Sequence, residues 1–279
     1  MNKFDKYPPF SVLMSIYIKE NPIYFDQSLK SIEQQTILPN EIVLVEDGPL
    51  TPKLYKVIDN HKLIWKDKLK IVKITQNGGL GSALRLGTKY VSTNWIARMD
   101  TDDISVQDRF ETQLKEIIKH PNYAVIGGQI DEFTDNPDNK VGSREVPLKK
   151  VDIYKYIQYR NPFNHPTVMI NKTKLLKVGG YKSTDRLEDY NLWVQFVKNK
   201  QEVVNLNRVL VHMRVNDDLY QRRGGIRYLK NYMKMKHKWY KQGIGTYKSV
   251  VISDISMIAN TIMPEKFRKY LYQNFLHKN

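Results

Sequence analysis

Two absences limit the kind of protein that this sequence encodes. The 279 residues include no cysteine, so disulfide frameworks and thiolate metal sites are excluded, and any metal would be held by oxygen or histidine ligands. No run reaches the roughly 18 uninterrupted apolar residues of a membrane-spanning helix, and the opening segment MNKFDKYPPF lacks the apolar core of a signal peptide. We therefore expect a cytoplasmic protein that does not cross a membrane.

Acidic residues are scarce relative to basic ones. The chain has 45 Lys and Arg against 29 Asp and Glu, a formal charge of +16, which favours an anionic partner such as nucleic acid, a membrane surface or a phosphorylated substrate. Residues 220–279 contain thirteen Lys and Arg but only Asp254 and Glu265, so most of the excess lies there. We predict a main domain over 1–219 and a basic helical extension over 220–279.

The usual glycine-rich nucleotide motifs are also missing. The segment NGGLGSALRLG (77–87) has neither the third glycine of a dinucleotide-binding loop nor the Gly-Lys-Ser/Thr of a phosphate loop. A tight turn leading into a helix explains most of its glycines.

Strand and helix patterns alternate over the first 100 residues. Buried strands are predicted at 10–18, 41–48, 68–75 and 92–100, with helices between them. Beyond these we expect strands at 123–133 and 166–171, a helix at 187–200, and one or two short strands within 202–215. This order predicts an α/β fold, a mostly parallel sheet with helices on both faces.

Distinctive polar residues follow the predicted strands. Tyr17 ends the first strand, Asp47 the second, and the segment ARMDTDDIS (97–105) brings Asp100, Asp102 and Asp103 to the end of the fourth. Ligands of such sheets bind outside the carboxyl ends of the strands, so these side chains should converge on one crevice. An Asp-x-Asp pair there can hold a hard cation whose remaining ligands are water and substrate phosphates.

The acidic segment has three other possible interpretations. One is a solvated loop with an N-cap aspartate for a helix beginning near Val106. An EF-hand fails because Ile104 replaces a ligand and Ser105 the required glycine. A phosphatase of the haloacid dehalogenase type remains a weak alternative, because Ile104 also breaks its D-x-D-x-T/V pattern.

Taken together, the motifs resemble those of family-2 glycosyltransferases with the nucleotide-sugar-binding GT-A fold. The resemblance is to small bacterial enzymes of capsule, exopolysaccharide and O-antigen assembly, and it covers roughly residues 10–230. The motifs that carry it are MSIYIKENP (14–22), VEDGP (45–49), NGGLGSALRLG (77–87), ARMDTDDIS (97–105), NPFNHPTVMI (161–170), GGY (179–181), LEDYNLW (187–193) and QRRGG (221–225).

The resemblance implies a role for each of several residues. Tyr17 would lie along the uracil ring, Asp47 would accept a hydrogen bond from the base, and Asp100 would contact the ribose. Asp102 would bind the cofactor, Mn²⁺ or Mg²⁺, and Asp189 would be the general base of an inverting transfer.

Further residues are candidates for the same site. By resemblance, Arg222 and Arg223 could reach the diphosphate. Asp103 would orient water on the metal or cap the following helix. Glu188 and Asp189 also suit the first turn of a helix, where acids are favourable in any case. The remaining candidates for lining the site are Glu46, Arg98 and His165.

The predicted function is transfer of a sugar from a UDP-sugar to a glycan or lipid-diphosphate-linked acceptor in surface polysaccharide synthesis. The alternatives are a sugar nucleotidyltransferase and a non-enzymatic protein that binds nucleic acid or an anionic surface. No nucleic-acid-binding module is recognisable, and we expect no nucleic acid partner.

The segment 226–241 predicts a basic amphipathic helix. It suits peripheral contact with the anionic inner face of the cell membrane, or docking on the catalytic domain with its lysines solvated. The basic stripe is Arg227, Lys230, Lys234, Lys238 and Lys241, and the expected apolar stripe is Ile226, Leu229, Met233 and Tyr240.

Overall fold

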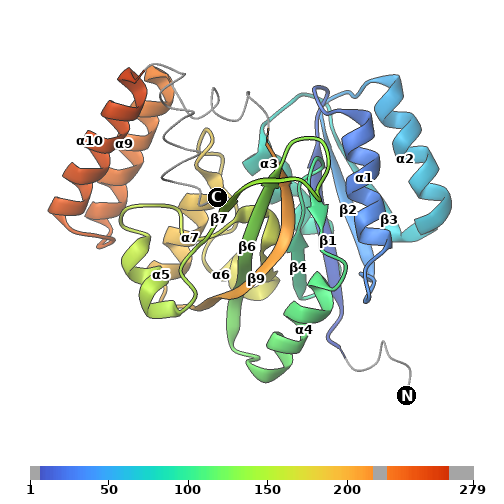
Figure 1. Cartoon of the computed structure of the whole chain (residues 1–279), viewed down its shortest axis with the longest axis horizontal. Helices are drawn as coiled ribbons and strands as arrows, with labels where there is room; N and C mark the ends of the chain where they lie inside the picture. Colours follow the sequence, from blue (N-terminus) through green and yellow to red (C-terminus); the bar gives the residue numbers. More distant parts are fainter. Residues whose placement is uncertain (1–6, 216–224, 264–279) are drawn as a thin grey trace.

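Four parallel strands form one half of a nine-stranded sheet (Figure 1). The structure is a computed structural model, and it describes residues 7–215 and 225–263. The parallel strands run in the spatial order β3-β2-β1-β4, which confirms the predicted alternation of strand and helix. They are β1 (Phe10–Ile16), β2 (Glu41–Asp47), β3 (Leu69–Ile74) and β4 (Trp95–Arg98).

The other half of the sheet is mixed. Beyond β4 the order continues β8-β6-β9-β5, with β7 paired to β6. Here β6 and β9 are parallel, while the other pairs are antiparallel. Residues 202–214 form one continuous strand rather than two short ones. These strands are β5 (Ile104–Ser105), β6 (Tyr123–Phe133), β7 (Lys140–Arg144), β8 (Met169–Asn171) and β9 (Glu202–Arg214).

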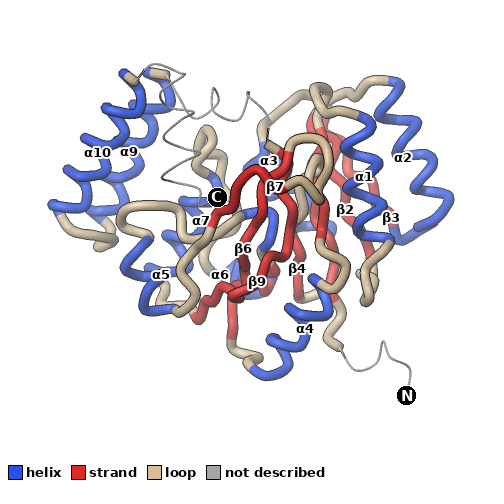
Figure 2. Tube along the Cα trace, viewed as in Figure 1, coloured by secondary structure: helices blue, strands red, loops and turns tan. Residues whose placement is uncertain are grey.

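Helices cover both faces of the sheet, as Figure 2 shows. Alternate residues of β1 separate the two cores: Val12 packs with α1, α2 and α4, whereas Leu13 packs with α3, α7 and α9. The helices are α1 (Pro22–Glu33), α2 (Pro52–Trp65), α3 (Leu80–Tyr90), α4 (Arg109–Lys119), α5 (Lys150–Tyr156), α6 (Lys172–Lys177), α7 (Glu188–Lys198), α9 (Ile226–Lys241) and α10 (Tyr247–Ile262). Short 3₁₀ turns occupy Lys66–Lys68 and His165–Thr167.

Local sequence explains where the first helix begins. The Asn21 side chain accepts a hydrogen bond from the Ile23 backbone N–H, and Pro22 occupies the first helical position. Phe25, Leu29 and Ile32, spaced three and four positions apart, form a fully buried face of this helix. In α7 likewise, Tyr190, Leu192, Trp193 and Phe196 are buried.

Two helices, α9 and α10, lie side by side at one end of the molecule (Figure 1). The apolar face predicted for α9 is wrong, because Ile226 is 68% exposed and Tyr240 is 40% exposed. The residues buried in its place are Tyr232, Met235, Lys236 and Trp239.

Those side chains join the core on the α7 side of the sheet, so α9 docks on the rest of the chain. The predicted basic stripe of α9 is exposed. The boundary predicted near residue 219 falls outside the described residues. Among the described helices, none combines the length and apolarity that crossing a membrane requires.

Candidate active site

The carboxyl ends of β1, β2 and β4 meet at one edge of the sheet. The register pairs Ile16 with Glu46 and Leu13 with Arg98, so the residues that follow these strands emerge together. Tyr17, Asp47 and Asp100 therefore lie at the same edge, as strand order predicts.

The acidic segment after β4 concentrates negative charge. Arg98 pairs with Asp100, and the backbone carbonyl of Asp100 accepts a hydrogen bond from Ser28 Oγ at 2.8 Å. Burial, together with the nearby carboxylates of Asp100 and Glu20, raises the pKa of Asp102 to about 7. Removing this repulsion is what a bound cation would do.

Asp103 has a structural partner. Its Oδ1 accepts a hydrogen bond from the backbone N–H of Arg214 at 2.9 Å, and only 2% of the residue is exposed. Burial raises the pKa of Asp103 well above its ordinary value, with Asp102 and Asp100 adding to the effect. The capping alternative is wrong, because the next helix begins at Arg109 with Asp108 in the N-cap position.

Arg214, at the end of β9, holds the acidic segment in place. Its Nε donates to the carbonyl of Asp102 at 3.1 Å, and Nη2 donates to Gln27 Oε1 at 2.7 Å. The guanidinium lies 3.8 Å from the centre of the Tyr24 ring and 4.4 Å from that of Phe133. One buried side chain thus connects three segments that are distant in the sequence.

Arg98 and His165 line the buried side of the acidic segment. Arg98 is 2% exposed, and its Nε and Nη1 have no hydrogen-bond partner among the described residues. Burial opposes its charge, but the Asp100 carboxylate outweighs this and the Arg98 pKa is raised. His165 Nε2 lies 3.0 Å from the Tyr181 hydroxyl. Burial, assisted by Arg98, lowers the pKa of His165 well below its ordinary value, so this imidazole is neutral.

Asp47 organises the glycine-rich turn. Its two carboxylate oxygens accept hydrogen bonds from the backbone N–H groups of Gly78 at 2.7 Å and Gly79 at 3.0 Å. Gly79 has φ of 80°, a conformation that favours glycine, and α3 begins at the next residue. Glu46 is also buried, with Lys73 Nζ at 3.7 Å, and burial raises its pKa against the effect of that lysine.

Glu188 and Asp189 occupy the first turn of α7. The Asp189 Oδ2 accepts a hydrogen bond from Asn161 Nδ2 at 2.7 Å, and Asp189 is half-buried. Burial raises the pKa of Glu188, and Asp189 raises it further. A side chain at Gly81 of α3 would come within 3.0 Å of Glu188 Cβ, so α7 begins directly beside the glycine-rich turn.

Tyr181 connects the two groups of acids. Burial raises its pKa; Arg98 opposes this, while Asp189, Asp100 and Glu188 increase it. The charges of Asp100, which follows β4, and of the two acids of α7 therefore act on the same buried phenol.

Helix α9 packs against α7. Lys236 Nζ donates to the carbonyl of Gln158 at 2.6 Å and to the Tyr190 hydroxyl at 2.9 Å. Trp239 Nε1 donates to Asn191 Oδ1 at 3.1 Å. Tyr190 and Asn191 directly follow Asp189, so the contacts from α9 help to hold the part of α7 that carries Asp189.

This geometry is accompanied by a clear sequence relationship. The sequence model described as "Glycosyl transferase family 2" matches residues 11–180, more than half of the chain. The chain belongs to this family. It is therefore a glycosyltransferase, and the nucleotidyltransferase, phosphatase and nucleic-acid-binding alternatives are set aside.

Characterised members of the family extend the match over nearly the whole chain. The UDP-Gal:alpha-D-GlcNAc-diphosphoundecaprenol beta-1,3-galactosyltransferase of Escherichia coli is 35% identical over 276 residues, covering 98% of each chain. The amylovoran biosynthesis glycosyltransferase AmsE of Erwinia amylovora is 35% identical over 267 residues, covering 95% of this chain and 98% of its own. Similar glycosyltransferases thus act in bacterial polysaccharide synthesis.

A solved structure confirms the GT-A type of fold. The mannosyltransferase PcManGT of Pyrobaculum calidifontis, in complex with GDP-Man and Mn²⁺, superposes with a TM-score of 0.63 at 14% identity. The match covers 83% of this chain and 65% of that one. At this identity the likeness establishes the fold alone.

Not every residue of the candidate site has an obvious signal in the sequence. Arg214 acts through contacts with residues far away in the chain, whereas Asn161, which contacts Asp189, opens the motif NPFNHPTVMI. Glu20 could have been noticed, because it follows the first strand within MSIYIKENP, and its Oε2 accepts a hydrogen bond from Thr101 at 2.5 Å. Arg222 and Arg223 lie outside the described residues.

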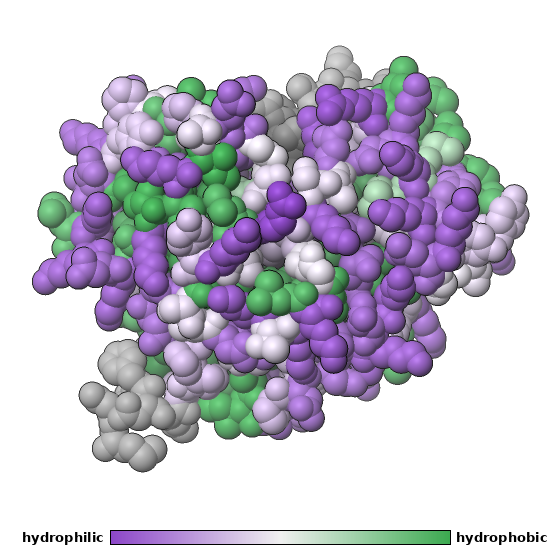
Figure 3. Space-filling view, turned by 180° about the vertical axis from the view of Figure 1, so that it is seen from behind, coloured by the Kyte–Doolittle hydropathy of each residue, from purple (hydrophilic) through white to green (hydrophobic). Residues whose placement is uncertain are grey.

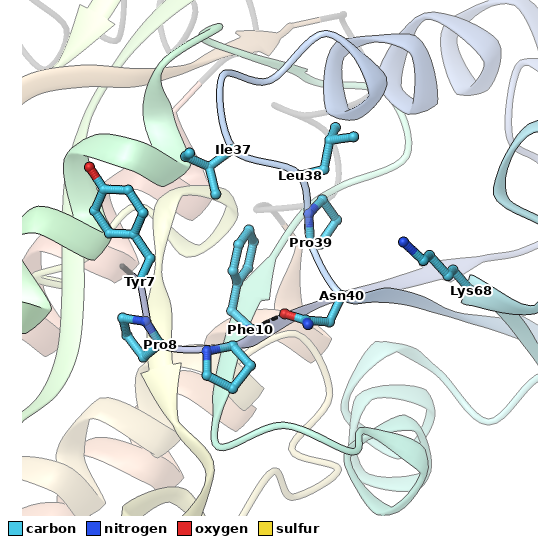
Figure 4. Close-up of a pocket in the computed structure, with 9 residues that line it drawn as sticks. Tyr7, Pro8, Phe10, Ile37, Leu38, Pro39, Asn40 and Lys68 are labelled. Carbon is cyan, nitrogen blue, oxygen red and sulfur yellow. Dashed lines mark hydrogen bonds between the residues drawn. The ribbon is translucent and has the colours of Figure 1, made fainter. Parts of the chain in front are cut away.

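One pocket lies away from this edge (Figure 4). Phe10 opens β1, and Asn40 and Lys68 precede β2 and β3, so the pocket lies at the amino ends of the strands. Asn40 Oδ1 accepts a hydrogen bond from the Phe10 backbone N–H at 3.0 Å. Its lining residues, which include no acid, are Tyr7, Pro8, Pro9, Phe10, Ile37, Leu38, Pro39, Asn40 and Lys68.

Proposed function

We propose that this glycosyltransferase transfers a sugar from a UDP-sugar, with inversion at C1, to a lipid-diphosphate-linked glycan acceptor in surface polysaccharide synthesis. The observation that carries the proposal is the separation of two carboxylate groups at one edge of the sheet. Asp102 lies in a crowded acidic segment after β4, whereas Asp189 lies at the start of α7 and accepts a hydrogen bond from Asn161. One group suits a cation and the other suits a proton transfer.

The acidic segment fits a divalent cation, Mn²⁺ or Mg²⁺, whose coordination the donor completes. Within residues 7–215 and 225–263, no three acidic or histidine side chains are grouped so that they could hold a metal by themselves. The crowding of Asp102 by Asp100 and Glu20 nevertheless favours a cation. We assign Asp102 as a metal ligand; when bound, the cation would neutralise the diphosphate and stabilise the departing UDP.

Asp189 is proposed as the general base. An inverting transfer needs a carboxylate that takes the proton of the acceptor hydroxyl as that oxygen attacks C1. Asp189 is half-buried, and the hydrogen bonds that it accepts from Asn161 Nδ2 and from the Tyr190 backbone N–H orient its carboxylate. Glu188 is mostly buried beside it and is proposed to line the site.

The donor roles follow the order of the strands. We propose that Tyr17 stacks on uracil, that Asp47 accepts a hydrogen bond from the base, and that Asp100 contacts the ribose. Asp47 already accepts two backbone hydrogen bonds, but each carboxylate oxygen has a second lone pair for the base. Arg98, whose buried Nε and Nη1 have no hydrogen-bond partner in the part of the chain that the structure describes, is proposed to line the site. Arg222 and Arg223 are proposed to reach the diphosphate.

The acceptor and location are inferred by similarity. A relative that matches over 98% of each chain is named for a diphosphoundecaprenol-linked acceptor. We propose that this chain uses an acceptor of the same class at the inner face of the cell membrane, with residues 226–241 near the anionic surface.

Isosteric variants test the proposal. UDP with Mn²⁺ should raise the melting temperature of the wild type, and Asp102→Asn should lose the metal-dependent part of that shift. Asp189→Asn should keep the full shift yet lose transfer from a panel of UDP-sugars and GDP-mannose to a diphosphate-linked acceptor. No shift with any nucleotide, or undiminished turnover by Asp189→Asn, would contradict the assignment.

A further inference from the structure

The polarity of α10 is inverted relative to a helix that covers a protein core. Its innermost residues include Ser249 and Ser253, which are 1% and 5% exposed. The large apolar residues point outward, with Ile255 at 62% and Ile262 at 77% exposed. The exposed apolar set is Tyr247, Val251, Ile252, Ile255, Ile258 and Ile262.

These residues form one surface. Positions 247, 251, 255, 258 and 262 recur at spacings of three and four, which places them along a single face of the helix. We call this set, together with Ile252, the outer face of α10. In Figure 3, which views the molecule from behind, hydrophobic side chains gather at the upper right edge, where α10 lies, with hydrophilic side chains beside them.

Polar contacts fix which way α10 faces. Asp254 Oδ2 lies 2.9 Å from His237 Nε2 of α9, and the Asp254 side chain is only 14% exposed. At the start of the helix, Thr246 and Ser249 form a capping box. Turning the isoleucines inward would break the contact to α9, so their exposure follows from the packing. Contiguous exposed apolar surface of this kind marks an interaction site.

The charges around the outer face indicate its partner. Asp254 is the only acid within residues 225–263, and it is turned inward. The exposed lysines of the two helices are Lys230, Lys234, Lys238, Lys241 and Lys248. Pairing this surface with a second copy would bring two sets of lysines together, whereas anionic phospholipid headgroups would neutralise them.

We propose that the outer face of α10 inserts into the interfacial layer of an anionic lipid bilayer, with the lysines of α9 and α10 at the headgroups. The helix is too short in its apolar stretch to span the bilayer, and it would lie in the plane of the surface. This inference deepens the proposed function, because a lipid-linked acceptor would be presented at the same surface. The inference also changes the membrane contact predicted from the sequence, which then depends on α10 and not on α9 alone.

Vesicle binding by the full chain tests the inference. The probes are vesicles of phosphatidylcholine alone and of phosphatidylcholine mixed with phosphatidylglycerol. The double variant Ile255→Ser/Ile262→Ser should lower cosedimentation with the mixed vesicles at least tenfold while keeping the wild-type melting temperature. The matched control is Leu63→Ser on α2, where an equally exposed leucine (78%) should be replaceable without effect.

The absence of cysteine allows insertion to be measured directly. A polarity-sensitive fluorophore on Ile258→Cys should shift to the blue with the mixed vesicles, and the same label on Leu63→Cys should not. Wild-type vesicle binding by the serine double variant would overturn the proposal, as would dimerisation of the wild type that the double variant abolishes.

Transfer to a water-soluble acceptor separates this inference from the proposed function. Ile255→Ser/Ile262→Ser should retain wild-type transfer to a diphosphate-linked acceptor with a short, soluble chain. If the wild type binds vesicles through α10 but transfers no sugar to any acceptor, the proposed function fails and the membrane surface stands. If sugar transfer is normal and the double variant binds vesicles as well as the wild type does, only the proposed membrane surface is contradicted.

Discussion

Asp103 is joined to Arg214, the last residue of β9, by a 2.9 Å hydrogen bond from the backbone N–H of the arginine to its carboxylate. The same arginine donates through Nε to the carbonyl of Asp102. Two adjacent acids of one motif therefore have different surroundings. The Asp103 carboxylate is hydrogen-bonded to the backbone of β9, whereas Asp102 is close to the carboxylates of Asp100 and Glu20. This division leads to the first prediction.

Asp103→Asn should remain folded and keep its response to Mn²⁺. The amide oxygen can still accept the Arg214 hydrogen bond, and the repulsion from Asp102 and Asp100 is removed. Because the folded state raises the pKa of Asp103, wild-type stability falls as pH rises from the unfolded value through the folded one. Thermal melts across pH should show a smaller loss in Asp103→Asn. If Asp103→Asn lost its response to Mn²⁺ while Asp102→Asn kept it, Asp103 and not Asp102 would be the metal ligand.

Arg214→Lys should destabilise the protein by about 2–4 kcal/mol, because lysine cannot reproduce the planar set of donors at a buried site. Arg214 is only 6% exposed and donates to carbonyl groups of Asp102 and Thr134 as well as to Gln27. Urea unfolding measures the change. Arg208→Lys, on the same strand, is the control, since its pair with Asp108 is exposed and should contribute below about 1 kcal/mol. Equal losses of stability in the two variants would contradict the proposal that Arg214 holds the acidic segment in place.

Binding of Mn²⁺ in the presence of UDP should weaken as pH falls below about 7, the raised pKa of Asp102. A metal competes with the proton for the carboxylate, so affinity should drop by about tenfold per pH unit in the acidic limit and level off above neutrality. Titration calorimetry between acidic and mildly alkaline pH tests this. Asp102→Asn should abolish the dependence, and a flat profile in the wild type would show that Asp102 is not the titrating ligand.

The strand ends could be predicted from sequence because they follow a general rule of parallel sheets. Tyr17, Asp47 and Asp100 each follow an apolar run, and parallel strands bring such positions to one edge. Arg214 could not be predicted, since its contact with Asp103 is made across 111 positions of sequence. Asn161 opens a motif visible in the sequence, but its pairing with Asp189, 28 positions away, could not be predicted.

The buried face of α9 shows a second limit of sequence reasoning. Apolarity favoured Ile226 and Met233, but the side chains that dock include Trp239, which donates to Asn191, and Lys236, whose amine reaches Tyr190. Burial lowers the pKa of Lys236 to about 7, a cost that no helical periodicity reveals. The polar groups that α7 offers, and not apolarity alone, therefore determine which face of α9 is buried.

Asn161→Ala should lower turnover roughly 10- to 100-fold without weakening the UDP-induced thermal shift. Its Nδ2 donates to Asp189 Oδ2 at 2.7 Å, and without it the carboxylate is held only through Oδ1, which accepts a hydrogen bond from the Tyr190 backbone N–H at 2.7 Å. Asn161→Asp should be worse, because it sets a second carboxylate against Asp189. The control is Asn199→Ala at the other end of α7, where the side-chain Nδ2 donates to the Gln195 carbonyl on the exposed surface. Steady-state rates at saturating donor, with acceptor varied, separate kcat from KM. A change confined to the donor KM would mean that Asn161 shapes the nucleotide site and that Asp189 is positioned by other contacts.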